Sequence, residues 1–216
     1  MFEIPADLPL KLSSLAWLLG GWQGWGTIAA LDSRPAPGEP SAASPGEDEF
    51  SPVLQDITAT VVGEQLRMTT RVFDGVMDGD FDPMWTASEG LDRIRPGELI
   101  AEETTYWSVD TPLAVVPAGP EEPRELRVVG ASTRGFAILW AGVAMGPRIQ
   151  LASDGLVRAP RADVLDHFTR MYGLVGGELM WASESMVPGG EFEVEVTGRL
   201  LRTASAGTGE SDGGNE

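Results

Sequence analysis

The sequence predicts an all-β domain that closes into a barrel, with a short helix at its start. Short runs of apolar and β-branched residues recur along the chain between Gly, Pro and Asp turn residues, which is an all-β pattern. Near the N-terminus, an apolar helical segment leads directly into a strand in which Gly and Trp alternate. Glycine inside a strand marks a tight bend or a close approach of two backbones, and a small closed barrel needs both.

The helix is expected over residues 15–19. Leu15, Leu18 and Leu19 share one helical face at i, i+3 and i+4 spacing. Ser13 or Ser14 is predicted to cap the N-terminus of the helix, because a serine hydroxyl accepts a hydrogen bond from the first free backbone N–H groups. Two consecutive glycines at residues 20–21 are expected to end it.

The strand that follows places Gly20, Trp22, Gly24 and Gly26 on one side, because strand side chains alternate with period two. One large indole therefore stands among three positions without side chains. We expect Trp22 to lie under the short helix and to seal one end of the barrel. The alternative is a Trp-anchored strand in some other β domain.

The remaining strands are read from apolar runs and turn signals. Gly63-Glu64 and Gly176-Gly177 predict hairpin turns, the second because glycine adopts the positive φ that tight hairpins need. On the last strand, Phe192, Val194 and Val196 alternate with acidic or polar residues and are expected to face inward. The strand candidates after the first are residues 56–62, 65–73, 84–87, 91–94, 99–109, 113–116, 126–131, 136–145, 148–151, 164–175, 178–186 and 191–202.

Two segments are predicted to be disordered. Residues 33–52 combine proline, glycine, serine and acid, a composition that cannot bury enough apolar surface to offset the entropy lost on ordering. Residues 203–216 form a tail rich in glycine, serine, threonine and acid. The 216 residues then make one domain over residues 8–202, interrupted by the insertion.

Composition excludes several kinds of partner. The chain has 33 acidic and 15 basic residues, and its formal charge of −18 argues against nucleic acid and anionic membranes. It has no cysteine, which removes disulfides and thiolate sites. Its first residues show neither a signal peptide nor a membrane span, so a cytoplasmic protein is expected.

No catalytic or metal constellation is found. His167 is the single histidine, and no Ser/His/carboxylate set is indicated around it. The glycines of residues 20–26 match neither a dinucleotide-binding fingerprint nor a P-loop. Asp78, Asp80 and Asp82 alternate, but no EF-hand glutamate follows, and an acidic solvent-exposed turn is expected in place of a calcium site.

The stretch LAWLLG at residues 15–20, overlapping the Gly20-x-Trp22-x-Gly24-x-Gly26 pattern, resembles the opening of the nitrobindin family. Residues 87–90, 151–153 and 171–179 resemble later segments of that family, so the resemblance covers residues 8–202. It implies an antiparallel up-and-down barrel of about ten strands, related in shape to the fatty-acid-binding proteins (calycins). It also implies a ferric haem b held by an axial histidine on the last strand, with chemistry on peroxynitrite and nitric oxide.

This chain departs from the family pattern at the axial ligand, because residues 191–202 contain no histidine. His167 lies on an earlier strand, on a face shared with Leu165, Thr169 and Met171, and is the one histidine that could be a substitute ligand if that face lines the barrel. Methionine and tyrosine also bind haem iron. The candidates of those types are Met145, Met171, Met180, Met186, Tyr106 and Tyr172.

The sequence therefore predicts a ferric nitrobindin-like barrel without histidine-ligated haem, with no enzymatic activity, that binds a small apolar ligand. One alternative is a haem-binding peroxynitrite isomerase with an unconventional axial ligand. Another is a ligand-free barrel that acts as an interaction module. The oligomeric state is not readable. The aromatic residues expected to line the barrel are Trp22, Trp85, Trp107, Trp140, Trp181, Phe73 and Phe136.

Overall fold

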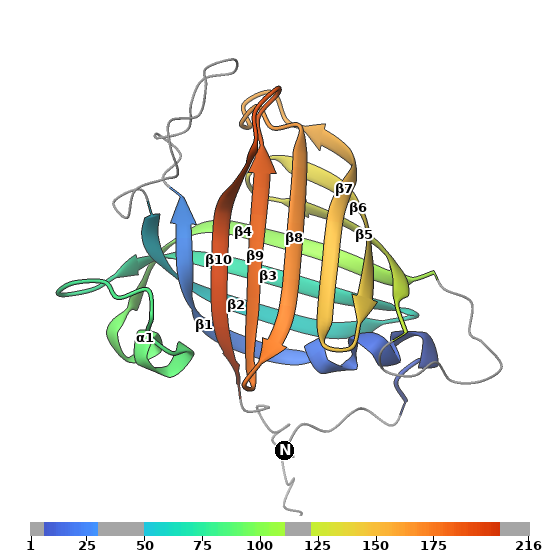
Figure 1. Cartoon of the computed structure of the whole chain (residues 1–216), viewed down its shortest axis with the longest axis horizontal. Helices are drawn as coiled ribbons and strands as arrows, with labels where there is room; N and C mark the ends of the chain where they lie inside the picture. The colour runs from blue at the N-terminus through green and yellow to red at the C-terminus, as the bar shows by residue number, and fades with distance from the viewer. Residues whose placement is uncertain (1–6, 30–49, 111–121, 204–216) are drawn as a thin grey trace, which may run out of the picture.

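Ten antiparallel strands form a closed barrel in the computed structural model, which describes residues 7–29, 50–110 and 122–203 (Figure 1). Every strand pairs with its sequence neighbours, and β1 pairs with β10 to close the sheet. The predicted up-and-down barrel is confirmed. The strands are β1 (Gly20–Ala29), β2 (Phe50–Val62), β3 (Gln65–Val76), β4 (Arg95–Val109), β5 (Arg124–Ser132), β6 (Phe136–Met145), β7 (Arg148–Arg158), β8 (His167–Val175), β9 (Glu178–Met186) and β10 (Phe192–Arg202).

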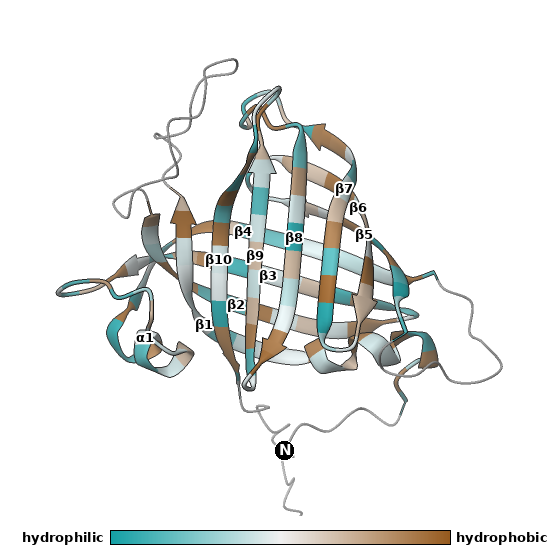
Figure 2. Ribbon diagram, viewed as in Figure 1, coloured by the Kyte–Doolittle hydropathy of each residue, from teal (hydrophilic) through white to brown (hydrophobic). Residues whose placement is uncertain are grey.

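Side chains alternate between the interior and the outer face of the barrel, which Figure 2 shows as alternating colour along the strands. On β9, for example, Leu179 and Trp181 are buried inside while Met180 is partly exposed outside. The main hydrophobic core lies within the barrel and continues beneath a helix at one end. No helix in the described ranges is long and apolar enough to cross a membrane.

The helix at the start of the chain is η1, a 3₁₀ helix over Leu10–Leu18. It begins five residues earlier than predicted, after Pro9, and neither Ser13 nor Ser14 caps it because both lie inside it. The expected capping was wrong because the N-cap residue is Pro9, whose side chain makes no capping hydrogen bond. The apolar side of η1 is buried against the core, so it closes one end of the barrel.

Trp22 lies under η1, as expected, with 2% of its surface exposed. Its indole Nε1 donates a hydrogen bond of 2.9 Å to the carbonyl oxygen of Leu18, at the end of η1. The guanidinium of Arg202 stands 4.1 Å from the indole ring centroid and donates to the carbonyl oxygens of Trp17 and Leu19. Trp22 and Arg202 thus fasten the helix to β1 and β10.

Gly24 and Gly26 let β1 and β10 approach closely. A Cβ atom on Gly24 would lie 2.1 Å from the carbonyl oxygen of Arg199, and one on Gly26 would lie 1.8 Å from that of Thr197. Neither position tolerates a side chain, since both obstacles are backbone atoms. The glycines of this strand are therefore required for the closure between the first and last strands.

The strand candidates at residues 84–87 and 91–94 were wrong, because the chain forms a turn at residues 83–84 and then helix α1 (Ala87–Arg93). A capping box starts α1: Thr86 Oγ1 accepts from the backbone N–H of Glu89, and the Glu89 carboxylate accepts from the backbone N–H of Thr86. The hydrogen bonds from Thr86 lower the pKa of Glu89. The Thr-x-x-Glu pattern was a readable helix signal.

Helix α1 lies against the outer face of β1, at the left of Figure 1. Trp25 points outward from β1 and donates a 2.9 Å hydrogen bond to the carbonyl oxygen of Thr86. Phe81 and Trp85 meet its ring edge-on. Trp85, like Phe73, packs in this outer cluster, so the expectation that these two residues line the barrel was wrong.

Other boundaries follow from the described residues. Phe50, Ser51 and Pro52, assigned to the disordered insertion, are the first residues of β2. The rest of that insertion from residue 33 to 49, the strand candidate at 113–116, and the tail from 204 onward lie outside the described residues. Gly63, Gly176 and Gly177 have φ values of 60°, 60° and 90°, which confirms both predicted hairpin turns.

Candidate functional site

An ion pair crosses the interior of the barrel between Arg170 on β8 and Glu103 on β4. Both side chains are largely buried, at 10% and 15% exposure. The guanidinium carbon of Arg170 lies 4.7 Å from the ring centroid of Trp140 and 5.6 Å from that of Trp181, within reach of a cation–π interaction with each. The barrel interior therefore contains a buried ion pair whose cation is flanked by two indoles.

The charge of Arg170 depends on Glu103. Burial by itself lowers the pKa of Arg170, but the adjacent Glu103 carboxylate outweighs burial and holds that pKa above its usual range. A buried ion pair of this kind is costly to break, because the remaining charge has no water around it.

A second ion pair joins Arg134 to Glu195, which is 3% exposed on β10. Arg134 also reaches Asp163, at 3.2 Å. Glu195 points inward because a β-bulge between Val194 and Val196 shifts the alternation of β10. The expectation that Phe192 and Val194 face inward was wrong for this reason: Phe192 is 46% exposed, and Val194 is outside the buried core.

The two ion pairs border an internal cavity of about 70 Å³. Thr70 and Ser132 add hydroxyls to its wall, and Phe136, Phe168 and Trp181 supply apolar surface. A buried water needs at least ~10–15 Å³, so this cavity has room for a few waters. Pockets for small organic ligands measure roughly 300–1,000 Å³. As described, this cavity is therefore too small for an organic ligand of that size.

Tyr172 is the buried tyrosine of the interior, at 1% exposure. Its ring stacks on Trp181 at 5.8 Å and meets the edge of Trp107 at 5.6 Å. Its hydroxyl faces the guanidinium of Arg170. Burial raises the pKa of Tyr172 to about 12, against a lowering contribution from Arg170.

We expect this raised pKa to make stability fall between pH 10 and about 12. In that window the folded protein keeps the Tyr172 proton while the unfolded chain loses it, so stability that is present below pH 10 is lost as the pH rises. Urea-unfolding midpoints of the wild type and Tyr172→Phe, measured from pH 9 to 12, check this. The wild-type curve should fall more steeply, and parallel curves would contradict the assignment.

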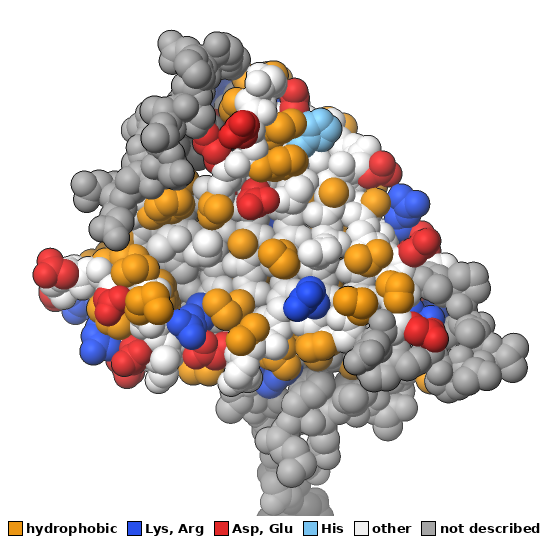
Figure 3. All heavy atoms as spheres, viewed as in Figure 1, with side chains coloured by type: hydrophobic (Ala, Val, Ile, Leu, Met, Phe, Trp, Pro, Cys, Tyr) orange, Lys and Arg blue, Asp and Glu red, His pale blue; other side chains and the backbone are white. Residues whose placement is uncertain are grey.

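The other residues considered as haem ligands lie outside the interior. His167 (pale blue in Figure 3) lies at the exposed start of β8 and shares the outer face with Thr169 and Met171. Met145, Met171 and Met180 are 45%, 48% and 38% exposed. Met186 and Tyr106 alternate with buried inward residues on β9 and β4, so they too face outward. Of the residues considered, only Tyr172 lies inside.

The interior does not fit a haem iron bound through histidine. The inward positions of β10 carry Glu195, Val196, Gly198 and Leu200, and the Glu195 carboxylate is already paired with Arg134. The space between the strands is occupied by the ion pair of Arg170 and Glu103 with its flanking indoles.

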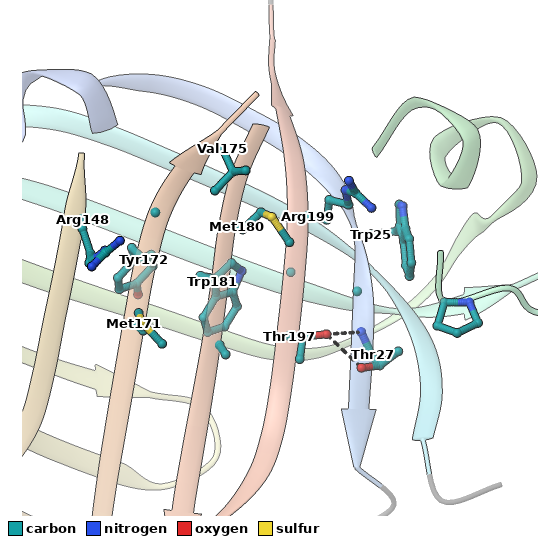
Figure 4. A pocket seen from close by; sticks show the side chains of 15 residues that line it. Trp25, Thr27, Arg148, Met171, Tyr172, Val175, Met180, Trp181, Thr197 and Arg199 are labelled. Carbon is teal, nitrogen blue, oxygen red and sulfur yellow. Dashed lines mark hydrogen bonds between the residues drawn. The ribbon is translucent and has the colours of Figure 1, made fainter. Parts of the chain in front are cut away.

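A larger concavity of about 440 Å³ lies outside the barrel, across β8, β9, β10 and β1 (Figure 4). Most side chains in its wall point outward from these strands, among them Trp25, Met171, Met180 and Arg199. We call this concavity the outer groove. No local sequence pattern indicates this groove, because its residues come from five separate strands and from the segment around Pro83.

Sequence reasoning also missed the interior ion pairs. None of Glu103, Arg170 and Arg134 is among the candidate residues that the sequence analysis names. A signal did exist in the spacing of these residues. Glu103 is two and four residues from Thr105 and Trp107 on β4, and Arg170 is two residues from both Phe168 and Tyr172 on β8. Period-two alternation places all of these side chains on the inner face.

Comparison with known proteins agrees with the fold. A family model described as the THAP4-like, heme-binding beta-barrel domain matches residues 11–202. The chain is 33% identical to a ferric nitrobindin-like protein of Beutenbergia cavernae, over 94% of this chain and 99% of the relative. It is 30% identical to a peroxynitrite isomerase of Leifsonia xyli subsp. xyli, over 94% and 99% of the two chains.

Among solved structures, the crystal structure of Rv2717c from M. tuberculosis superposes with a TM-score of 0.62. It is 22% identical and covers 92% of this chain and 100% of its own, and it supports the fold alone. Because the family model spans nearly the whole barrel and relatives above 30% identity match end to end, this chain belongs to the nitrobindin family.

Proposed function

We propose that this protein is a nitrobindin-family barrel that works without histidine-ligated haem and binds a small, largely apolar ligand. The absence of histidine-ligated haem is inferred from the ion pair of Arg170 and Glu103 beside Trp140 and Trp181. This cluster lies in the barrel interior, and no side chain of β10 offers an imidazole. The binding of a small ligand is supported by the outer groove, whose volume is in the range of small-molecule pockets.

Hemin titration tests the haem half of the proposal. Adding hemin to the purified protein should produce no saturable, one-to-one Soret shift, because no imidazole is available inside the barrel. His167→Ala is the matched variant, and it should give the same weak spectrum as the wild type. A stoichiometric Soret band in the wild type would overturn this half of the proposal.

The second candidate is a peroxynitrite isomerase that holds haem through another ligand. It is favoured by the relative of that name at 30% identity and by the buried hydroxyl of Tyr172 in the interior. Tyrosine binds ferric haem as a phenolate. The raised pKa of Tyr172 opposes this, since burial favours the neutral phenol. If hemin does bind, loss of the spectrum in Tyr172→Phe would select this candidate.

A third function, a ligand-free interaction module, remains as an outcome of ligand-binding tests. It would be selected if neither hemin nor any small apolar probe bound to the folded protein.

A further inference from the structure

The outer groove has apolar walls and a floor of small residues. Trp25 stands at one end and Arg148 at the other, with Met180 and Val175 between them (Figure 4). Met171, Val175 and Met180 are 48%, 59% and 38% exposed, and orange patches mark this face in Figure 3. Methionines of this kind adapt to irregular apolar ligands.

The floor is low because the outward positions at its centre are small. Gly173 on β8 and Ala182 on β9 both line the groove. A Cβ atom added to Gly173 would meet only the carbonyl oxygen of Pro147, at 3.9 Å, which is ordinary contact. The glycine there is therefore not required by the barrel, unlike Gly24 and Gly26, and the space above it is open.

The two arginines of the groove differ in their partners. Arg199 forms an ion pair with Glu178 and donates to the carbonyl oxygen of Trp85 at 2.9 Å. Arg148 is exposed and makes no ion pair within the described residues, although the chain as a whole carries a formal charge of −18. An unneutralised guanidinium at the end of an apolar groove fits the head group of a small organic anion, since its planar donors match a carboxylate or sulfonate.

We propose that the outer groove binds a small amphipathic anion, with an apolar body across Met171, Gly173 and Met180 and a carboxylate-type head at Arg148. This inference rests on the proposed small-ligand function and gives it a place and a chemical class. The apolar body replaces water over the exposed methionines, and the head group pairs with Arg148. The barrel interior takes no part in binding.

Two dyes separate the apolar and the charged contributions. 1-Anilinonaphthalene-8-sulfonate carries an aromatic body with a sulfonate, and N-phenyl-1-naphthylamine carries the same body without charge. Fluorescence titration of the full chain should show one saturable site for the sulfonate dye. The neutral dye should bind about threefold to tenfold more weakly, the difference that one exposed charge-assisted contact supplies.

Two matched pairs of variants and one further variant then locate the site. Gly173→Val should fill the groove and weaken both dyes by about tenfold or more, while leaving the melting temperature unchanged or higher, because valine favours strands. Gly155→Val is its control on β7, where the added Cβ meets only the Leu139 side chain at 3.5 Å. Ala182→Leu should act like Gly173→Val.

The charge variants test the head-group contact. Arg148→Gln should weaken binding of the sulfonate dye only. Arg161→Gln, beyond the other end of β7, should leave the binding of both dyes unchanged.

Each outcome decides the inference. Dye binding that is insensitive to Gly173→Val in a folded variant would overturn the groove as the site while leaving small-ligand binding in place. No binding of either dye would overturn the ligand half of the proposed function itself. A wild-type dimer in light scattering that Gly173→Val converts to a monomer would assign the groove to a second copy of the chain and overturn the small-anion proposal.

Discussion

Trp22→Ala is expected to lower the free energy of unfolding by about 3–5 kcal/mol, the usual cost of truncating a buried aromatic residue to alanine. The indole is 2% exposed and packs under η1, and its Nε1 hydrogen bond to Leu18 would be lost with it. Arg202 would lose the ring on which it stacks. Chemical denaturation, with the midpoint and slope fitted for each variant, measures the change.

Two controls bracket this result. Trp22→Phe should cost less because it keeps most of the apolar volume and loses mainly the hydrogen bond to Leu18. Gln23→Ala, at the exposed neighbouring position on β1, should stay within about 0.5 kcal/mol of the wild type. A Trp22→Ala variant that unfolds like the wild type would show that η1 does not depend on this indole.

Glu103→Gln should lower the free energy of unfolding by about 3 kcal/mol, because it leaves the charge of Arg170 buried without its partner. The value is set at the low end of the range for buried pairs, since Trp140 and Trp181 still stabilise the cation through their rings. The size of the side chain hardly changes, so the loss reports the charge and not a cavity. Urea denaturation at neutral pH measures it.

The adjacent glutamate provides the matched control. Glu102 faces outward and pairs with Arg71, whose side chain is 53% exposed, so Glu102→Gln should cost less than about 1 kcal/mol. The double variant Glu103→Leu with Arg170→Met should be more stable than Glu103→Leu alone, because no buried charge remains. Equal losses for Glu102→Gln and Glu103→Gln would contradict the interior ion pair.

The sequence by itself determined the barrel and the end that η1 closes. Gly/Trp alternation in β1 requires a backbone that approaches its neighbour closely, and the structure shows that neighbour to be β10. Hairpins at Gly63 and at Gly176-Gly177 were readable because positive φ is a local property of glycine. Trp22 was placed correctly because its neighbours on the same side of the strand have no side chains.

Local sequence patterns gave wrong predictions at α1, where strand and helix signals overlap, and at β10, where a bulge interrupts the alternation. The segment that forms α1 was read as strands from its apolar residues, although the Thr86 and Glu89 capping box indicated a helix. On β10, strict alternation put Glu195 outside. One extra residue in a bulge reverses every side chain beyond it, and nothing in the local sequence marks a bulge.

Only the tertiary structure decided what fills the barrel and where a ligand fits. Arg170 and Glu103 are 67 residues apart, and Arg134 and Glu195 are 61 apart, so their pairing follows from barrel closure and not from local pattern. The outer groove likewise collects Arg148, Gly173, Met180 and Trp25 from separate strands. Outside the bulge of β10, period-two alternation indicated which residues face inward, and long-range register decided which of them meet, because contacts between distant strands have no local signature.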